Sequence, residues 1–205
     1  MADFLAVDTS SRYLTVLAKK GDKTVIRHIG DCAMQHSVIL MGEIESALEE
    51  AGLTPDGCDY FAAVTGPGSF TGIRIGVATI KGFAYAAGKD LKGVTAFDLI
   101  AYNVNSTSPF LVVIDAAHDH YYACGYSAGE VVLPPCYLSA EKVASFGTPV
   151  YGFEDLKFEN YTRLAVRDCI LKAVENAPKS RDIHALYVRR SQAEETLDAD
   201  KKVGI

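Results

Sequence analysis

The residues best suited to chemistry lie in a glycine-rich stretch at 66–76, which reads Gly-Pro-Gly-Ser-Phe-Thr-Gly-Ile-Arg-Ile-Gly. An apolar run at 61–65 precedes it and predicts a buried strand, and a helical pattern follows at 73–87. Glycine allows positive φ at such a strand-to-helix turn, and the first amides of the helix favour an anion. Ser69 and Thr71 would add hydroxyl groups to an anion site.

The spacing of this stretch differs from that of the common nucleotide-binding loops. Thr71 stands where the dinucleotide fingerprint has its third glycine, and no Gly-Lys-Ser or Gly-Lys-Thr follows, as it would in a P-loop. We therefore favour a structural turn over a phosphate site.

Two other sets of residues could hold a metal. His118 and His120 flank Asp119 at an expected hairpin and would face the same side of a strand, but they lack a third ligand, so we favour a solvated turn and expect no metal. The cysteines are odd in number and form no Cys-x-x-Cys, which favours free thiols in a reducing compartment. They are Cys32, Cys58, Cys124, Cys136 and Cys169.

The helix expected at 73–87 is unusually apolar. Arg74, Lys81 and Tyr85 share one narrow face, and the remaining arc of roughly 220° is about twice what packing on one sheet requires. Either a second layer of the same chain or another protein must therefore cover the extra surface. We favour another protein, and expect a Gly76→Glu, Ala86→Glu double variant to fold without associating. The predicted partner interface comprises Val38, Ile39, Gly72, Ile75, Gly76, Thr79, Gly82, Phe83 and Ala86.

Composition narrows the classes of function. The chain has 205 residues, is 49% hydrophobic and carries a net charge of −6, which argues against its holding a nucleic-acid backbone alone. The sequence starts without a basic, signal-like segment and contains no apolar run of membrane-spanning length. We expect a soluble, cytoplasmic protein without membrane association.

The pattern along the chain predicts two strand sets with helices between them. Strands are expected at 4–10, 13–18, 24–29 and 61–65, with a hairpin turn at 19–22 between the second and third. Helices are expected at 37–51, with Leu40, Met41 and Ile44 on its core face, at 73–87, and after Thr95, which would be an N-cap with the acid Asp98 at N3. A polar segment at 103–109 suggests a domain boundary. Beyond it, strands are expected at 110–115, 121–126, 130–133 and 149–152, and helices at 139–146 and 161–175. The predicted domains are 1–105, with the glycine loop and dimerisation helices, and 106–205, shorter and ending in a polar tail.

The glycine-rich stretch closely resembles the signature of the TsaB (YeaZ) family, a subunit of the bacterial machinery that makes threonylcarbamoyladenosine in tRNA. Residues 5–10, 36–40 and 93–97 resemble the family's opening strand, first-helix start and a later helix entry. Ile114-Asp115-Ala116-Ala117 resembles an Asp-Ala-Arg strand end with Ala117 in place of Arg, and 185–189 resembles a Pro-x-Tyr-x-Arg element with Ala185 in place of Pro. The signature-loop residues are Gly66, Pro67, Gly68, Ser69, Phe70, Thr71, Gly72 and Arg74.

The resemblance implies an α/β, two-lobed actin-like ATPase fold (sugar kinase/Hsp70, RNase H-like), in which each lobe is a mixed five-stranded sheet flanked by helices. It also implies a non-catalytic partner subunit for threonylcarbamoylation of adenosine 37 in tRNAs that read ANN codons, with no catalytic residues of its own. Such a subunit docks on and activates a TsaD-like catalytic subunit through its first two helices, which also form a homodimer in isolation. A TsaE-like ATPase would join the pair, and tRNA would be contacted only through the complex.

Two alternatives stay open. A nucleotide-binding, ATPase-like switch would use Asp8, Thr9 and Ser10 as its first phosphate hairpin, but the usual glycine is missing there and no Gly-Gly pair occurs in the sequence. We expect a vestigial nucleotide site at most, with no cofactor and with ATP or ADP bound only weakly or in the complex. The other alternative, an M22-like glycoprotease, lacks a Gly-x-Ser-x-Gly elbow and a His-Glu-x-x-His motif.

Overall fold

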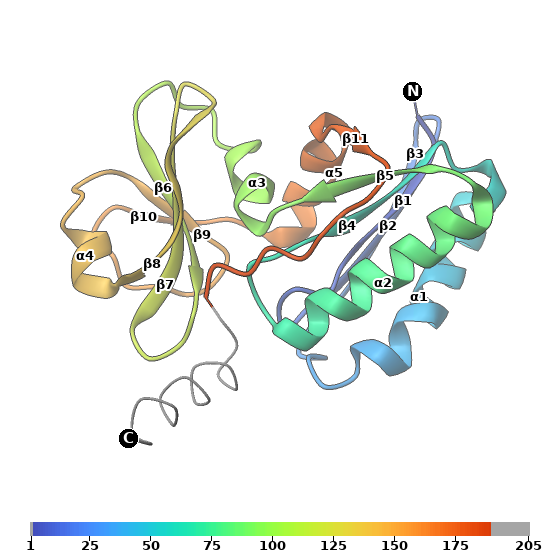
Figure 1. Cartoon of the computed structure of the whole chain (residues 1–205), viewed down its shortest axis with the longest axis horizontal. Helices are drawn as coiled ribbons and strands as arrows, with labels where there is room; N and C mark the ends of the chain where they lie inside the picture. The colour runs from blue at the N-terminus through green and yellow to red at the C-terminus, as the bar shows by residue number, and fades with distance from the viewer. Residues whose placement is uncertain (1, 190–205) are drawn as a thin grey trace, which may run out of the picture.

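The chain folds into two mixed β-sheets with helices around and between them (Figure 1). The computed structural model describes residues 2–189. The first sheet has the strand order β11-β5-β4-β1-β2-β3. Its strands are β1 (Phe4–Asp8), β2 (Leu14–Lys20), β3 (Lys23–Ile29), β4 (Tyr60–Val64), β5 (Asp90–Val94) and β11 (Lys179–Ser180). Strands β1, β4 and β5 run parallel, whereas β2, β3 and β11 are antiparallel to their neighbours.

The second sheet repeats the same topology. Its order is β10-β9-β6-β7-β8, in which β6, β7 and β8 form an antiparallel meander and β9 and β10 add in parallel. These strands are β6 (Phe110–Asp115), β7 (His120–Ser127), β8 (Glu130–Ser139), β9 (Val150–Gly152) and β10 (Tyr161–Arg163). The expected two-lobed arrangement of mixed sheets is thus present, with β11 as a sixth strand in the first sheet.

The helices form separate layers on the two sheets. Helices α1 (His36–Ala51) and α2 (Phe70–Ala87) cover one face of the first sheet and share a core with Leu5, Val7 and Phe61. On its other face, α3 (Ala96–Ala101) and α5 (Val166–Asn176) pack between the two sheets, in one core that contains Phe4 of β1 and Val112 of β6. Helix α4 (Ala140–Ala144) covers the outer face of the second sheet, and η1 (Pro55–Gly57) is a 3₁₀ turn before β4.

The structure corrects several sequence-based expectations. The segment 161–175 is not one helix, because its first three residues pair with β9 and the helix begins at Val166. Helix α2 begins at Phe70 rather than Ile73, and Met41, which we expected in the core, is 55% exposed. The division at residues 105 and 106 stays a prediction: the chain crosses back to the first sheet through β11. The predicted polar tail lies outside the described residues.

A capping box formed by Thr95 and Asp98 fixes the start of α3, as the sequence predicted. The Thr95 side chain accepts a hydrogen bond from the Asp98 N–H, and the Asp98 carboxylate accepts one from the Thr95 N–H. This capping box satisfies amides that the helix itself leaves free. Among residues 2–189, none of the helices combines the length and the apolar character that crossing a membrane requires.

Because α3 lies between the sheets, loss of its cap should weaken the whole fold. We expect Thr95→Ala to lower the free energy of unfolding by about 1 kcal/mol. The free energy of unfolding is measured by urea denaturation monitored by far-UV circular dichroism. Thr107→Ala, in an exposed loop, is the control and should change little; equal stabilities of the two variants would contradict the role of the cap.

Candidate functional site

The glycine loop lies directly against the end of β1. The Ser69 N–H donates to the Ser10 carbonyl at 2.6 Å, and the Thr9 hydroxyl donates to the Gly72 carbonyl at 2.6 Å. A Cβ on Gly68 would lie 2.1 Å from the Ser10 carbonyl oxygen, and one on Gly72 would lie 2.0 Å from that of Thr9. These two glycines are therefore required by close backbone approach, and Gly66, with φ of 101°, by its conformation.

The three residues of the predicted vestigial nucleotide site are buried and occupied by contacts within the chain. Asp8 is 3% exposed, and its Oδ1 accepts hydrogen bonds from the Ser10 N–H at 2.8 Å and the Ser10 hydroxyl at 2.6 Å. Burial raises the pKa of Asp8 above its ordinary value of 3.8, because desolvation outweighs these hydrogen bonds. The Asp8 carboxyl group thus fixes the turn after β1, against which the glycine loop packs.

Two glycines of α2, Gly72 and Gly76, lie on its inner face against the sheet. They were wrongly included in the predicted partner interface. Gly72 and Gly76 are buried, and a Cβ on Gly76 would meet the Thr9 hydroxyl at 2.4 Å. The Gly76→Glu substitution would therefore break the packing of α2 on β1 instead of testing association. Gly82, by contrast, has open space around the position of a Cβ, as does Gly42 on α1.

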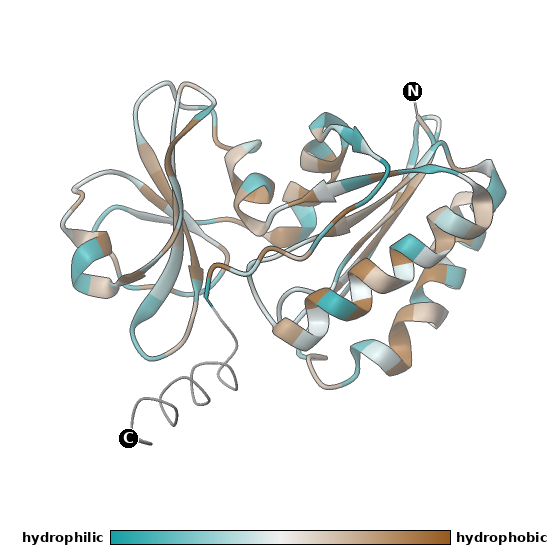
Figure 2. Cartoon of the chain, viewed as in Figure 1, coloured by the Kyte–Doolittle hydropathy of each residue, from teal (hydrophilic) through white to brown (hydrophobic). Residues whose placement is uncertain are grey.

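An exposed, largely apolar surface runs along α1 and α2, and Figure 2 shows hydrophobic residues along both helices as well as along the strands. We call it the α1–α2 outer face. Val38 is 79% exposed, Tyr85 91% and Met34, just before α1, 94%. The face comprises the exposed residues Met34, Val38, Met41, Gly42, Ala78, Gly82, Tyr85 and Ala86, bordered by the half-buried Ile39, Ile75, Thr79 and Phe83.

Arg74 holds the flank of α2, through a partner that sequence reasoning missed. Its guanidinium lies 3.7 Å from the ring centroid of Phe70, and its Nε donates to the Tyr187 hydroxyl at 2.9 Å. The Leu186 N–H donates to the Thr65 carbonyl at 2.7 Å, so the segment before residue 190 is tied across the glycine loop. The resemblance singled out 185–189, which was the one sequence signal for this contact.

The remaining candidates form no reactive cluster. His118 and Asp119 have positive φ in the turn before β7, and the His118 carbonyl interacts with the His120 ring at 2.7 Å. Within residues 2–189, no three His, Cys, Asp or Glu side chains are grouped so that they could hold a metal. The five cysteines are free thiols, and burial raises the pKa of Cys124 and of Cys169 to about 11, which opposes thiolate chemistry.

Two cavities open between the lobes and share Tyr13. The first, about 610 Å³, lies where β1 and β6 end and is lined by residues that include Ser10, Arg12, Gly68 and Asp115. Glu154 and Asp155 add two more carboxyl groups, and burial raises the pKa of Glu154. The second, about 460 Å³, is lined by Tyr13, His28, Phe153 and residues 163–168.

A matched pair of glycine variants tests the close approach of α2 to β1. Alanine favours helix by about 1 kcal/mol over glycine at either position. We expect Gly72→Ala nevertheless to lower the free energy of unfolding by about 1–3 kcal/mol, because its Cβ overlaps the Thr9 carbonyl. Gly82→Ala should raise it by about 0.5–1 kcal/mol. Chemical denaturation compares them, and a stabilised Gly72→Ala would refute the packing constraint.

The raised pKa of Asp8 predicts a pH dependence with a definite sign. Between the unfolded-state pKa near 3.8 and the higher folded-state pKa, the folded protein binds more protons, so Asp8 makes stability fall as pH rises. Asp8→Asn keeps an oxygen acceptor for Ser10 without the buried charge. Its stability relative to wild type should therefore increase from pH 4 to pH 7 in urea titrations. Asp22→Asn, in the exposed β2–β3 turn, should show no such trend; a falling difference for Asp8→Asn would reverse our assignment.

The comparisons with known proteins point in one direction. The family described as TsaD, tRNA N6-adenosine threonylcarbamoyltransferase, matches residues 30–167. The TsaB protein of Bacillus subtilis is 30% identical over 99 residues, which cover 48% of this chain and 43% of that protein. The TsaB protein of Escherichia coli is 30% identical over 129 residues, covering 62% and 55%. The chain thus spans about half the length of the curated relatives it matches.

Solved structures share the fold of this chain over most of its length. YeaZ from Pseudomonas aeruginosa has a TM-score of 0.72 at 21% identity, over 91% of this chain and 100% of that one. A second structure from the same organism, titled as similar to peptidase YEAZ, gives 0.72 at 22% identity, over 92% and 100%. The chain belongs to the family described as TsaD, tRNA N6-adenosine threonylcarbamoyltransferase, and it is similar in sequence to TsaB proteins of that pathway and in fold to YeaZ.

Proposed function

We propose that this chain is a non-catalytic partner subunit in the biosynthesis of threonylcarbamoyladenosine at adenosine 37 of tRNA. In this proposal it docks on a TsaD-like catalytic subunit through the α1–α2 outer face and activates it. The same face forms a homodimer when the partner is absent. A TsaE-like ATPase joins the pair, and tRNA is bound by the complex rather than by this acidic chain alone.

The observation that carries the proposal is the exposure of the α1–α2 outer face. Val38, Met41 and Tyr85 are large apolar or aromatic side chains that lie more than half exposed on two neighbouring helices. Gly42 and Gly82 leave open space where a side chain would otherwise stand, so a helix of the partner could approach the backbone closely. Contiguous apolar surface of this kind is typical of protein–protein contacts.

The contacts of the residues that follow β1 favour a partner role over an enzyme. Asp8, Thr9 and Ser10 are engaged in hydrogen bonds within the chain, and the cavity beside them presents Asp115, Glu154 and Asp155 against the single cation of Arg12. Such a cavity repels phosphates unless a metal offsets the carboxylates. A nucleotide switch and a glycoprotease are both less well supported by these contacts.

A charge placed on the outer face should prevent docking while leaving the fold intact. We expect Val38→Glu with Ala86→Glu to weaken binding to a co-expressed TsaD-like subunit at least tenfold, because both side chains are exposed in the isolated chain and would be desolvated in the complex. Affinity co-purification and titration calorimetry measure the loss, and circular dichroism checks the fold.

Val132→Glu is the matched control, an exposed valine on β8 of the second sheet. It should leave binding unchanged. Equal binding by wild type and the double variant would show that the α1–α2 outer face is not the docking surface. Threonylcarbamoyl transfer to tRNA by this chain without any partner would contradict the non-catalytic role.

A further inference from the structure

A third cavity, about 380 Å³ in volume, lies where α3 meets the β7–β8 hairpin of the second sheet. Parts of α3, of the loop that leads to β6 and of the turn between β7 and β8 line it. None of its lining residues belongs to the glycine loop or to the α1–α2 outer face. Its volume falls in the range of about 300–1,000 Å³ that holds small ligands.

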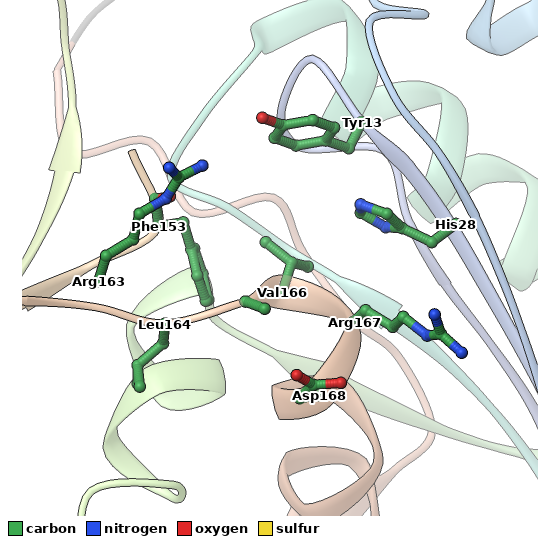
Figure 3. Close-up of a pocket in the computed structure, with 9 residues that line it drawn as sticks. Tyr13, His28, Phe153, Arg163, Leu164, Val166, Arg167 and Asp168 are labelled. Carbon is green, nitrogen blue, oxygen red and sulfur yellow. The ribbon is translucent and has the colours of Figure 1, made fainter. Parts of the chain in front are cut away.

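Both charged residues in the described lining of this cavity are acidic. They are Asp98 on α3 and Glu130, which is exposed at the start of β8. Among the described residues, no lysine, arginine or histidine lies within salt-bridge distance of either carboxylate. The 460 Å³ cavity of Figure 3 differs, since Arg163 and Arg167 line it together with Asp168. The cavity beside α3 therefore favours a cation.

Asp98 is half-buried and has one oxygen that can accept a hydrogen bond from a ligand. Its Oδ2 accepts from the Thr95 N–H at 3.1 Å and from the Thr95 hydroxyl at 2.7 Å. Its Oδ1 accepts from the Tyr126 hydroxyl over a longer 3.3 Å. Burial raises the pKa of Tyr126 above its ordinary value of 10.0, so this hydroxyl stays protonated near neutral pH. Because a carboxylate oxygen has two lone pairs, Oδ1 can accept a second hydrogen bond.

Three aromatic residues line the same cavity. Tyr102, directly after α3, is 37% exposed, and the rings of Phe110 and Tyr126 stack with their centroids 5.6 Å apart. In the part of the chain that the structure describes, no lysine or arginine lies over any of these three rings. A guanidinium group is flat and weakly hydrated, so it stacks on aromatic rings and also donates to carboxylates. The acids and the rings thus fit the same group.

We propose that this cavity binds a guanidinium group carried on a short hydrocarbon chain. The guanidinium donates to Oδ1 of Asp98 and lies against Tyr102, and Glu130 adds negative charge from its exposed position. The group belongs to a free alkylguanidine or to an arginine side chain of another protein, which share this chemistry. The assignment is independent of docking through α1 and α2, because the cavity lies outside that face.

The test uses the whole chain, with butylguanidinium as the probe and butylurea, its neutral isostere, as the comparison. Binding is measured at low salt by NMR, from shift changes at the amides of the cavity residues between Asp98 and Val131. Butylguanidinium should bind at least tenfold more tightly than butylurea, because only the cation gains a charge-assisted hydrogen bond to Asp98.

A capped pentapeptide with a central arginine distinguishes the two sources of the group. Tighter binding than that of butylguanidinium indicates an arginine of another protein, and weaker binding indicates a free alkylguanidine. The measurement uses the same amides of the cavity residues.

The Asp98→Asn substitution removes the charge and keeps an oxygen acceptor for the Thr95 N–H. It should weaken butylguanidinium binding at least tenfold. Asp168→Asn is the matched control, because Asp168 is also an acid in the first turn of its helix but lies outside this cavity. It should leave the affinity unchanged.

Glu130→Gln, at an exposed side chain, provides a second variant if loss of the capping box unfolds Asp98→Asn. It should still weaken butylguanidinium binding severalfold. Absence of butylguanidinium binding at millimolar concentration, equal affinity for butylurea, or equal affinity of wild type and Glu130→Gln would overturn the proposal.

Discussion

The close approach of α2 to the end of β1 is the constraint on which the first lobe depends. Thr9 and Ser10 present carbonyl oxygens where the loop and the first turn of α2 pass, and a Cβ at Gly68 or Gly72 would fall within about 2 Å of them. Two hydrogen bonds then close the junction, from the Ser69 amide to the Ser10 carbonyl and from the Thr9 hydroxyl to the Gly72 carbonyl. The buried carboxyl of Asp8 holds Ser10 in place for them. This packing determines where α2 starts and which side of it faces outward.

The second lobe has the same sheet topology but lacks a comparable junction between a helix and the end of a strand. Strands β9 and β10 are parallel neighbours, yet only residues 153–160 connect them, and no helix corresponding to α2 lies between them. A crossover between parallel strands usually needs a dozen or more residues and a helix to cover the sheet. The inner face of this sheet is instead covered by α3 and α5, which it shares with the first sheet. The lobes are therefore joined by a common core, with the two cavities at its edges.

Sequence reasoning recovered the elements whose signals are local. The β2–β3 hairpin, the capping box of Thr95 and Asp98, and the apolar strands β4 and β6 follow from alternation, turn residues and caps, and all were found where expected. The predictions that were wrong depend on contacts between residues that are distant in the sequence. Tyr161 and Arg163 fit a helical pattern, but pairing with β9 draws them into a strand. Gly76 looked like part of a helix-docking surface until the position of Thr9 showed which side it faces.

The same limit applies to the candidate sites, because charge and exposure belong to positions in space rather than to motifs. Helical periodicity alone separated Arg74 from the apolar arc, but only the fold brings Tyr187 to it across 113 positions of sequence. Arg163 and Arg167 are unremarkable in the sequence, and they line the same cavity as Tyr13 and His28 only because the fold brings β10 and α5 beside these residues. The glycine loop, whose sequence favoured a structural turn over a phosphate site, uses the Ser69 amide and its glycines to hold α2 against β1.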